Sequence, residues 1–320
     1  MGAGPKKRRD LEDLISLRDW LRYAVSKFTE AKLVYGHGTD NALDEAAFLL
    51  LSALHLPVDH LDPWLDCRLT GDERALIRDL IEKRVTTRKP APYLVNAAWI
   101  QGRRFYVDER VIVPRSYIGE LLCRDALSPI VTEPDRVRTV LELCSGSGCL
   151  AILAAEAFPN AKITATDFSK DALDVAKRNV SEHGFETRIV LIKSDLFEDV
   201  PDMAYDLIIA NPPYVTSKAV SAFPAEYRAE PSLAHDGGPD GLNLVRKILD
   251  HAPRYLSQHG VLIVEVGQAR GALERAYPQI PFVWLDTEAS QGEVFAINAE
   301  DFAASKPAQT GPKVKHKRTV

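Results

Sequence analysis

The residues with the clearest chemical potential in this 320-residue chain are four consecutive ones, Asn211, Pro212, Pro213 and Tyr214. They follow an apolar run, 205–210, that has the composition of a buried strand. Because proline has no N–H, the strand cannot continue its hydrogen-bond ladder through this motif. The asparagine amide and the Pro212 carbonyl are then free to accept both hydrogens of a planar –NH2 group. This chemistry suits methyl transfer to an amide or amine nitrogen; the alternative is a plain turn with an asparagine cap.

A second candidate site lies upstream, where another predicted strand runs into the segment 142–149 (ELCSGSGC) and then into a helix. Glycines at such a turn, here Gly146 and Gly148, let a ligand approach the backbone closely. The spacing also satisfies a loose dinucleotide pattern. A nicotinamide cofactor and a tight turn without any ligand are therefore alternatives to a methyl donor.

Acidic residues at three successive strand ends favour S-adenosylmethionine as the cofactor. Asp167 ends the second predicted strand, where a carboxylate can accept both ribose hydroxyls, and Asp195 follows the third, where it can meet the adenine amine. Glu142 suits a cationic methionine moiety and would be a poor neighbour for a pyrophosphate. Each acid alone could be a helix cap or a solvated loop residue. Their shared position matters because ligands of open α/β sheets bind outside the carboxyl ends of the strands.

The elements that must position these residues alternate between strand-like and helix-like patterns. Alternation of this kind predicts an α/β fold with a mostly parallel sheet covered by helices. Helices are predicted at 150–158 and 170–183. Strands are predicted at 137–143, 162–166, 189–192, 207–210 and 261–266, followed by a terminal hairpin of 282–286 and 294–298.

The first ninety residues predict a small helical bundle. Its first helix has apolar residues at helical spacing, namely Leu14, Leu17, Leu21, Ala24 and Phe28. A second helix follows 39–41, and a third begins after Thr70, with Glu73 at the spacing of a capping box. We expect Leu76, Leu80 and Val85 on the buried face of the third helix, and no cluster of titratable residues in the bundle.

A change of period after the bundle predicts a linker between two domains. Short strands are expected at 93–95, 98–100 and 105–107, forming a β-hairpin. The predicted domain organisation is then a basic segment (1–10), a helical domain (11–90), a hairpin linker (91–115), a catalytic domain (116–303) and a basic, disordered tail (304–320). The long glycine-containing segment 226–242 is predicted to be a lid over the substrate.

With the glycine loop and the Asn-Pro-Pro-Tyr motif in this order, the chain resembles class I S-adenosylmethionine-dependent methyltransferases, whose core is a Rossmann-like sheet of seven strands. More narrowly, it resembles the glutamine-amide methyltransferases that modify translation proteins. The motifs at 35–41 (YGHGTDN), 88–94 (RKPAPYL) and 105–116 (FYVDERVIVPRS) resemble the branch that acts on the third large-subunit ribosomal protein. The sister branch, which acts on release factors, typically continues Pro-Arg with Pro-Glu-Thr-Glu, whereas SYIG stands at 116–119 here.

The resemblance implies a role for each motif residue. Asn211 and the Pro212 carbonyl would each accept one hydrogen of the substrate amide, and Pro213 would complete the catalytic motif. Tyr214 would pack against one face of the substrate amide. The cofactor S-adenosylmethionine would be bound by Glu142, Cys144, Gly146, Gly148, Asp167, Asp195 and Asn211. Many relatives carry glycine at the position of Cys144, and cysteine is small enough to keep the turn. The protein client would be a large-subunit ribosomal protein, free or on an assembling subunit, recognised by the helical domain and the hairpin.

Composition sets limits on the class of protein. A net charge of −5 argues against a nucleic-acid-coating protein, and no run approaches the ~18 apolar residues of a membrane span. Four cysteines without a paired framework favour a cytoplasmic location, and the histidines have no metal-ligand spacing. The rivals are a release-factor methyltransferase, an adenine amino-methyltransferase acting on nucleic acid, a nicotinamide-dependent oxidoreductase, and an assembly factor that uses the fold only as a scaffold.

Overall fold

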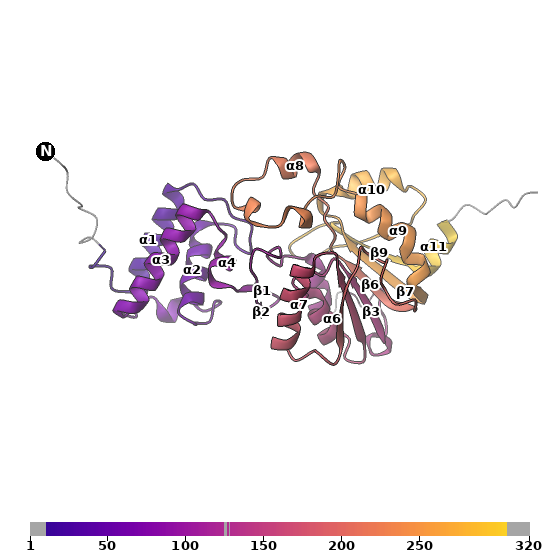
Figure 1. Ribbon diagram of the computed structural model, residues 1–320, viewed down its shortest axis with the longest axis horizontal. Helices are drawn as coiled ribbons and strands as arrows, with labels where there is room; N and C mark the ends of the chain where they lie inside the picture. The colour runs from indigo at the N-terminus through magenta and orange to yellow at the C-terminus, as the bar shows by residue number, and fades with distance from the viewer. Residues whose placement is uncertain (1–10, 125–126, 128, 306–320) are drawn as a thin grey trace, which may run out of the picture.

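The computed structural model describes residues 11–124, 127 and 129–305. A group of helices at the amino-terminal end lies beside a larger α/β unit, and a small hairpin lies between them (Figure 1). The predicted basic segment 1–10 and nearly all of the predicted basic tail, 306–320, lie outside the described residues. Within the described part of the chain, no helix is both long enough and apolar enough to cross a membrane.

A seven-stranded sheet, counted over the described residues, organises the larger unit in the order β5-β4-β3-β6-β7-β9-β8. The five strands from β5 to β7 pair in parallel, and β9 pairs antiparallel with both β7 and β8. This confirms the predicted mostly parallel sheet and its terminal hairpin. The strands are β3 (Thr139–Leu143), β4 (Lys162–Asp167), β5 (Ile189–Lys193), β6 (Tyr205–Ala210), β7 (Leu256–Glu265), β8 (Val283–Leu285) and β9 (Val294–Asn298).

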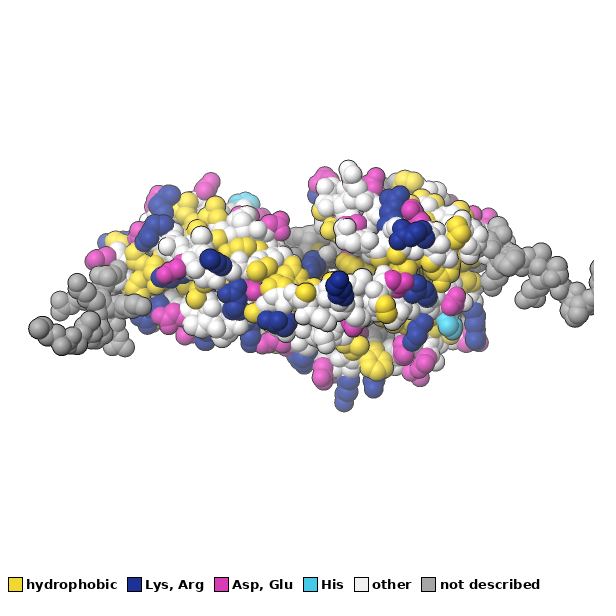
Figure 2. Space-filling view, turned by 90° about the horizontal axis from the view of Figure 1, so that it is seen from above, with side chains coloured by type: hydrophobic (Ala, Val, Ile, Leu, Met, Phe, Trp, Pro, Cys, Tyr) yellow, Lys and Arg dark blue, Asp and Glu magenta, His cyan; other side chains and the backbone are white. Residues whose placement is uncertain are grey.

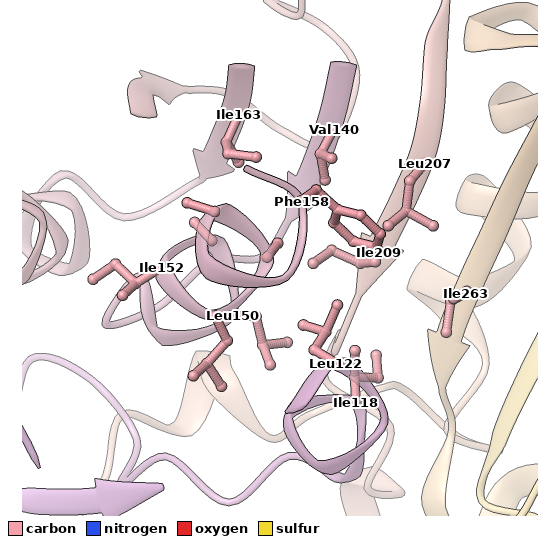
Figure 3. Close-up of a cluster of buried hydrophobic side chains, with 14 of the residues drawn as sticks. Ile118, Leu122, Val140, Leu150, Ile152, Phe158, Ile163, Leu207, Ile209 and Ile263 are labelled. Atoms are coloured by element: carbon pink, nitrogen blue, oxygen red, sulfur yellow. The ribbon is translucent and has the colours of Figure 1, made fainter. Parts of the chain in front are cut away.

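Both faces of the sheet are covered, which explains the continuous apolar runs in its central strands. Along β6, Leu207 and Ile209 face one cluster, while Ile208 and Ala210 face the other. The first cluster surrounds helix α6 (Cys149–Ala157) and includes Phe158 (Figure 3). The helices on this face are α5 (Tyr117–Cys123), α6 and α7 (Lys170–Glu182). Those on the other face are α9 (Asn243–Tyr255), α10 (Arg270–Ala276) and α11 (Ala299–Ser305). A short helix, α8 (Ser217–Ser221), lies in the segment after β6.

The strand order reverses between β3 and β6. The chain goes outward from β3 to β4 and β5, and then returns to place β6 on the other side of β3. Helices that leave two adjacent parallel strands in opposite directions open a crevice at their carboxyl ends. The glycine segment follows β3 and the Asn-Pro-Pro motif follows β6, so the topology brings the two predicted sites together.

The amino-terminal bundle consists of α1 (Leu17–Glu30), α2 (Ala42–Ala53) and α3 (Gly71–Thr87). The predicted capping box at the start of α3 is confirmed, because Thr70 and Glu73 satisfy each other's backbone N–H groups. Short 3-10 turns lie at η1 (Asp62–Trp64), η2 (Pro134–Arg136), η3 (Tyr227–Ala229), η4 (Ser232–Ala234) and η5 (Gly267–Ala269).

The prediction of which residues form the buried face of α3 was wrong at Leu76. Leu76 is 44% exposed, and the buried side chains are instead Ile77, Leu80, Ile81 and Arg84. These four have the i, i+3, i+4, i+7 spacing of a helical stripe. The stripe is hard to predict from apolar periodicity because its last member, Arg84, is a charged residue.

The bundle also contains the titratable cluster that the sequence prediction had excluded. Arg84 and Glu45 are both fully buried, and Arg84 Nε donates to Glu45 Oε1 at 2.7 Å. Glu226 comes from the segment after β6. Its Oε1 atom lies 3.9 Å from Arg84 Nη1 and 2.6 Å from Arg88 Nη2. Burial raises the pKa of the Glu45 carboxyl, although Arg84 opposes the shift. A buried ion pair of this kind fixes α2, α3 and the segment after β6 relative to one another.

The linker differs from the prediction at its start. Residues 93–95 belong to a short helix, α4 (Ala91–Val95), and not to a strand. A hairpin is present, in which β1 (Ala98–Ile100) pairs with β2 (Arg103–Phe105), but its second strand lies two residues earlier than the predicted 105–107. Pro92 near the start of α4 explains the helix, because proline lacks the N–H that a strand needs and a first helical turn does not.

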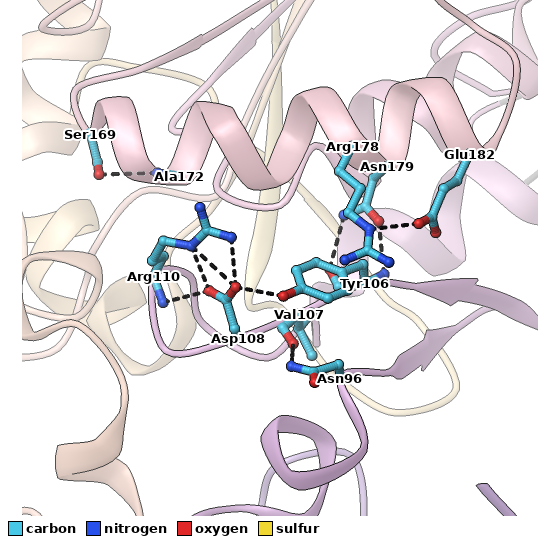
Figure 4. A network of polar contacts seen from close by, with 10 residues as sticks. All are labelled: Asn96, Tyr106, Val107, Asp108, Arg110, Ser169, Ala172, Arg178, Asn179 and Glu182. Atoms are coloured by element: carbon cyan, nitrogen blue, oxygen red, sulfur yellow. Dashed lines mark hydrogen bonds and ion pairs between the residues drawn. The ribbon is translucent and has the colours of Figure 1, made fainter.

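Asn179 of α7 fixes the segment after the hairpin. Its side chain accepts a hydrogen bond from the Tyr106 N–H at 2.7 Å and donates to the Tyr106 carbonyl at 3.0 Å (Figure 4). It also donates to the Ser147 carbonyl of the glycine loop at 2.9 Å. The Arg178 guanidinium lies over the Tyr106 ring, 3.6 Å from its centroid. The linker and the glycine loop are therefore held by the same helix.

We predict that Arg84→Ala lowers the free energy of unfolding by about 3–5 kcal/mol, because it leaves the Glu45 carboxylate buried without its cationic partner. Chemical denaturation followed by circular dichroism measures this loss. Arg18→Ala is the matched control, because the Arg18 ion pair with Asp66 is solvent-exposed and its loss should change little. Equal stability of the Arg84→Ala variant and the unsubstituted protein would contradict the role of the buried pair.

Candidate active site

The Asn-Pro-Pro-Tyr motif follows β6 at the carboxyl edge of the sheet, as predicted. Asn211 and Pro213 line a cavity of about 290 Å³ that the glycine loop also lines. Within the described residues, no protein group hydrogen-bonds the Asn211 side-chain amide or the Pro212 carbonyl. The motif therefore presents two unpaired acceptors beside the cavity, which is the arrangement expected when two prolines end a ladder.

The glycine loop after β3 forms another part of the cavity wall through Cys144 and Gly146. Gly146 has φ +53° and donates its N–H to the Asp167 carboxylate at 2.8 Å. Cys144, which also lines the cavity, has φ +59°. A side chain at positive φ is strained, and this left-handed position is occupied here by cysteine, whose side chain is small.

Gly148 has a different surrounding from Gly146. It does not line the cavity, and a Cβ atom at this position would lie 3.1 Å from Ala176 Cβ of α7. Its smallness therefore serves the close packing of α6 on α7, one of the purposes that glycines serve in such loops. Cys149, the next residue, is buried, and burial raises the pKa of its thiol to about 12, which keeps it protonated.

The three predicted acids lie at the ends of β3, β4 and β5. Asp167 lines the cavity, and its carboxylate accepts hydrogen bonds from the N–H groups of Gly146 and Ser169, both at 2.8 Å. Burial raises the pKa of the Asp167 carboxyl despite these two bonds. Asp195 also lines the cavity, with Lys247 Nζ 3.5 Å from its carboxylate.

Glu142 is not among the residues that line the cavity, although it lies within β3 next to the glycine loop. Its side chain is almost completely buried, and its Oε2 atom has no hydrogen-bond partner among the described residues. Burial raises the pKa of this carboxyl well above its usual range. A buried carboxyl oxygen without a partner is costly, so the Oε2 atom is suited to a cationic or hydrogen-donating ligand group.

The segment 226–242 forms a further wall of the cavity through Pro231, Leu233 and Ala234. Both of its buried acids have cationic partners: Glu226 pairs with Arg88, and Glu230 accepts two bonds from Arg115 at 2.8 and 2.7 Å. The segment is thus fixed to the helical bundle and to the linker. Its closure over a substrate stays a prediction.

The glycines of this segment pack directly against the catalytic motif. A Cβ at Gly237 would lie 2.7 Å from the Pro213 carbonyl oxygen, and one at Gly241 would lie 2.3 Å from the Tyr214 carbonyl oxygen. Alanine at either position would therefore displace the motif itself. Such substitutions would lower turnover whether or not the segment moves.

Tyr214 is not among the residues that line the cavity, and its hydroxyl donates to Glu265 Oε1 at 3.0 Å. Glu265 ends β7, is fully buried, and also accepts hydrogen bonds from Ser116 Oγ and the Tyr117 N–H. The sequence analysis missed this residue. Its signal was an acid inside the apolar run 261–266, at the end of a strand adjacent to β6.

The structure brings most of the predicted site residues to one cavity. Those that line it are Cys144, Gly146, Asp167, Asp195, Asn211 and Pro213. Those that lie beside it without lining it are Glu142, Gly148, Pro212 and Tyr214. Among the described residues, no group of three or more His, Cys, Asp or Glu side chains could hold a metal ion.

The strand order with its antiparallel β9, the glycine loop after β3 and the Asn-Pro-Pro motif after β6 define a class I methyltransferase fold. The family model described as "Methyltransferase small domain" matches residues 125–226, which include both of these motifs.

The chain belongs to the family of ribosomal protein uL3 glutamine methyltransferases. The relative bearing this name in Bradyrhizobium diazoefficiens is 53% identical over 294 residues, which cover 90% of this chain and 92% of the relative. The relatives of the same name in Burkholderia pseudomallei and Neisseria gonorrhoeae are 52% and 50% identical, each over 90% of this chain and 96% of their own length. The predicted family and branch are thus confirmed.

We predict that Asp167→Ala weakens S-adenosylmethionine binding about 10- to 100-fold, because it removes a charged acceptor from the cavity and releases the Gly146 N–H. Isothermal titration calorimetry measures this affinity. Asp202→Ala is the matched control, because Asp202 is an exposed acid that precedes β6, at the opposite edge of the sheet. An unchanged affinity in the Asp167→Ala variant would refute its cofactor role.

Proposed function

We propose that this protein transfers a methyl group from S-adenosylmethionine to the side-chain amide nitrogen of a glutamine in ribosomal protein uL3. The observation that carries the proposal is the pair of unpartnered acceptors, the Asn211 side-chain oxygen and the Pro212 carbonyl, at the edge of a cavity whose lining includes Asp167 and Asp195. The names of the relatives support the choice of client.

The two acceptors address the difficulty of the reaction. An amide nitrogen is a poor nucleophile because its lone pair is delocalised into the carbonyl. Hydrogen bonds from the –NH2 group to the Asn211 oxygen and to the Pro212 carbonyl would fix the nitrogen in one orientation, which saves entropy in the transition state. The same acceptors would stabilise the positive charge that develops on nitrogen. The methylated nitrogen is strongly acidic and loses its proton readily, so the site needs no strong base.

The residues present fit the cofactor. S-Adenosylmethionine supplies an electrophilic methyl group on a sulfonium centre when bound. Asp167 and Asp195 offer carboxylates to hydroxyl and amine donors, and Cys144 and Gly146 leave backbone exposed to the cavity. The unpaired Oε2 atom of Glu142 suits the positively charged methionine end of the ligand.

Recognition of a protein client is proposed for the helical bundle and the linker. An apolar hollow lies where these two parts meet, lined in part by Phe48, Pro92, Trp99 and Val113. On the face drawn in Figure 2, Lys and Arg side chains are interspersed with Asp and Glu side chains, and hydrophobic side chains lie among them. A mixed surface of this kind suits a protein partner better than a nucleic acid, whose binding proteins concentrate basic residues. The proposed site of action is the cytoplasm, with uL3 either free or on an assembling large subunit.

We predict that the purified protein and labelled S-adenosylmethionine label uL3 on one glutamine, as located by mass spectrometry. Ribosomal proteins from cells that lack this enzyme are the substrate, because their target glutamine is unmodified. Release factors and total RNA are offered in parallel reactions. Label confined to a release factor would move the activity to the sister branch, and label confined to RNA would contradict the amide chemistry.

A further inference from the structure

Glu265 is a fully buried carboxylate one contact away from the proposed reaction centre. We infer that Glu265 is a positioning residue for methyl transfer, which acts through the Tyr214 hydroxyl to hold the tyrosine ring as one wall of the glutamine slot. This inference rests on the proposed function, because that function places Tyr214 against the substrate amide.

The carboxylate of Glu265 uses both of its oxygens. Oε1 accepts the Tyr214 hydroxyl at 3.0 Å, and Oε2 accepts Ser116 Oγ at 2.6 Å and the Tyr117 N–H at 2.9 Å. The bonds to Oε2 come from the start of α5, so they attach the carboxylate to an element other than the segment that carries Tyr214. The tyrosine hydroxyl therefore finds its acceptor at a position set by β7 and α5.

The rest of the Tyr214 ring has little freedom once the hydroxyl is held. Gly267, two residues after Glu265, has φ +47°, and a Cβ at this position would lie only 2.5 Å from Tyr214 Cε2. The ring thus packs on bare backbone at the end of β7. Gly241 packs against the backbone of the same tyrosine. Glu265 and these two close approaches together define one orientation of the ring.

A purely structural carboxylate at this place would be an expensive choice. Burial raises the pKa of Glu265 to about 7, so the surroundings oppose its charged form. Ser116 Oγ accepts the Ile118 N–H at 3.2 Å, and Glu265 accepts the Tyr117 N–H, so the two residues share the cap of α5. Among the described residues, the Tyr214 hydroxyl has Glu265 as its hydrogen-bond acceptor, so the placement of this hydroxyl depends on the carboxylate.

Two conservative substitutions at Glu265 distinguish the effect of side-chain length from the effect of negative charge. Glu265→Gln keeps the length of the side chain and can still hydrogen-bond Tyr214, Ser116 and Tyr117, but it removes the charge. Glu265→Asp keeps the charge but shortens the side chain by one methylene, so it cannot reach Tyr214 and α5 together. Positioning predicts that the Gln variant keeps most of the wild-type kcat and that the Asp variant loses about 10-fold or more. The KM for S-adenosylmethionine should change little in both.

Tyr214→Phe tests whether Glu265 acts through the hydroxyl. The loss in kcat of the double variant, Tyr214→Phe with Glu265→Asp, should not exceed the larger single loss, because both changes break the same contact. Tyr205→Phe is the matched control: its hydroxyl is also hydrogen-bonded, at 3.4 Å to Thr164, but at the start of β6 and away from the cavity. Melting temperatures show that each variant is folded.

A readout without substrate keeps this inference separate from the proposed function. With [13Cζ]tyrosine labelling, the Tyr214 signal is assigned by its absence in the Tyr214→Phe variant, and it should shift in Glu265→Asp more than in Glu265→Gln. Wild-type protein that labels no glutamine would defeat the proposed function, whatever the spectra show. An active wild type whose Asp variant is unimpaired, whose Gln variant is inactive, or whose double-variant losses multiply would overturn the role given to Glu265.

Discussion

The structure depends on the point where β6 stops. A central strand of a parallel sheet normally passes its hydrogen-bonding groups to its neighbours, but Pro212 and Pro213 have no N–H to offer, so the ladder between β3 and β7 ends at Ala210. The Asn211 amide and the Pro212 carbonyl are left at the crevice where the strand order reverses. Every other feature of the site either holds these two acceptors in place or brings a ligand to them.

Buried charged side chains fix most of the residues around the two acceptors. Glu265 fixes Tyr214 from the β7 side, and Glu230 fixes the segment after β6 to Arg115 of the linker. The Arg115 guanidinium and the neighbouring His235 hold the pKa of the Glu230 carboxyl well below its usual range, against the effect of burial. The cost of burying such charges is offset only when their partners are well aligned. The positions of the walls around the acceptors are consequently sharply defined.

The helical bundle is connected to the same walls. Arg84 and Arg88 reach Glu226, which precedes the part of the segment that lines the cavity. A client bound by the bundle and the linker would thus contact elements that are continuous with the site. This gives a physical reason for the bundle and the catalytic unit to occur in one chain.

Much of this could be predicted from the sequence because its signals are local. Proline chemistry, the capping box at Thr70, strand alternation and acids at strand ends each depend on nearby residues. The structure confirms the capping box and the alternation, and it places the acids at the ends of the strands. The missed features depend on partners distant in sequence. Arg84 looks like a surface residue until Glu45 is placed beside it, and Glu265 looks like an irregularity in a strand until Tyr214 and Ser116 are brought to it. The short helix at 91–95 was missed because its apolar residues fit both periods.

The measurement that tests the central claim most directly compares Asn211→Ala with wild type in two quantities, the single-turnover rate of uL3 methylation and the calorimetric affinity for S-adenosylmethionine. If Asn211 holds the substrate amide, the rate should fall about 100-fold or more while the affinity stays nearly unchanged. Asn160→Ala, a change in an exposed asparagine outside the cavity, serves as the control. A rate close to wild type, or a loss of cofactor affinity as large as the loss of rate, would contradict the account.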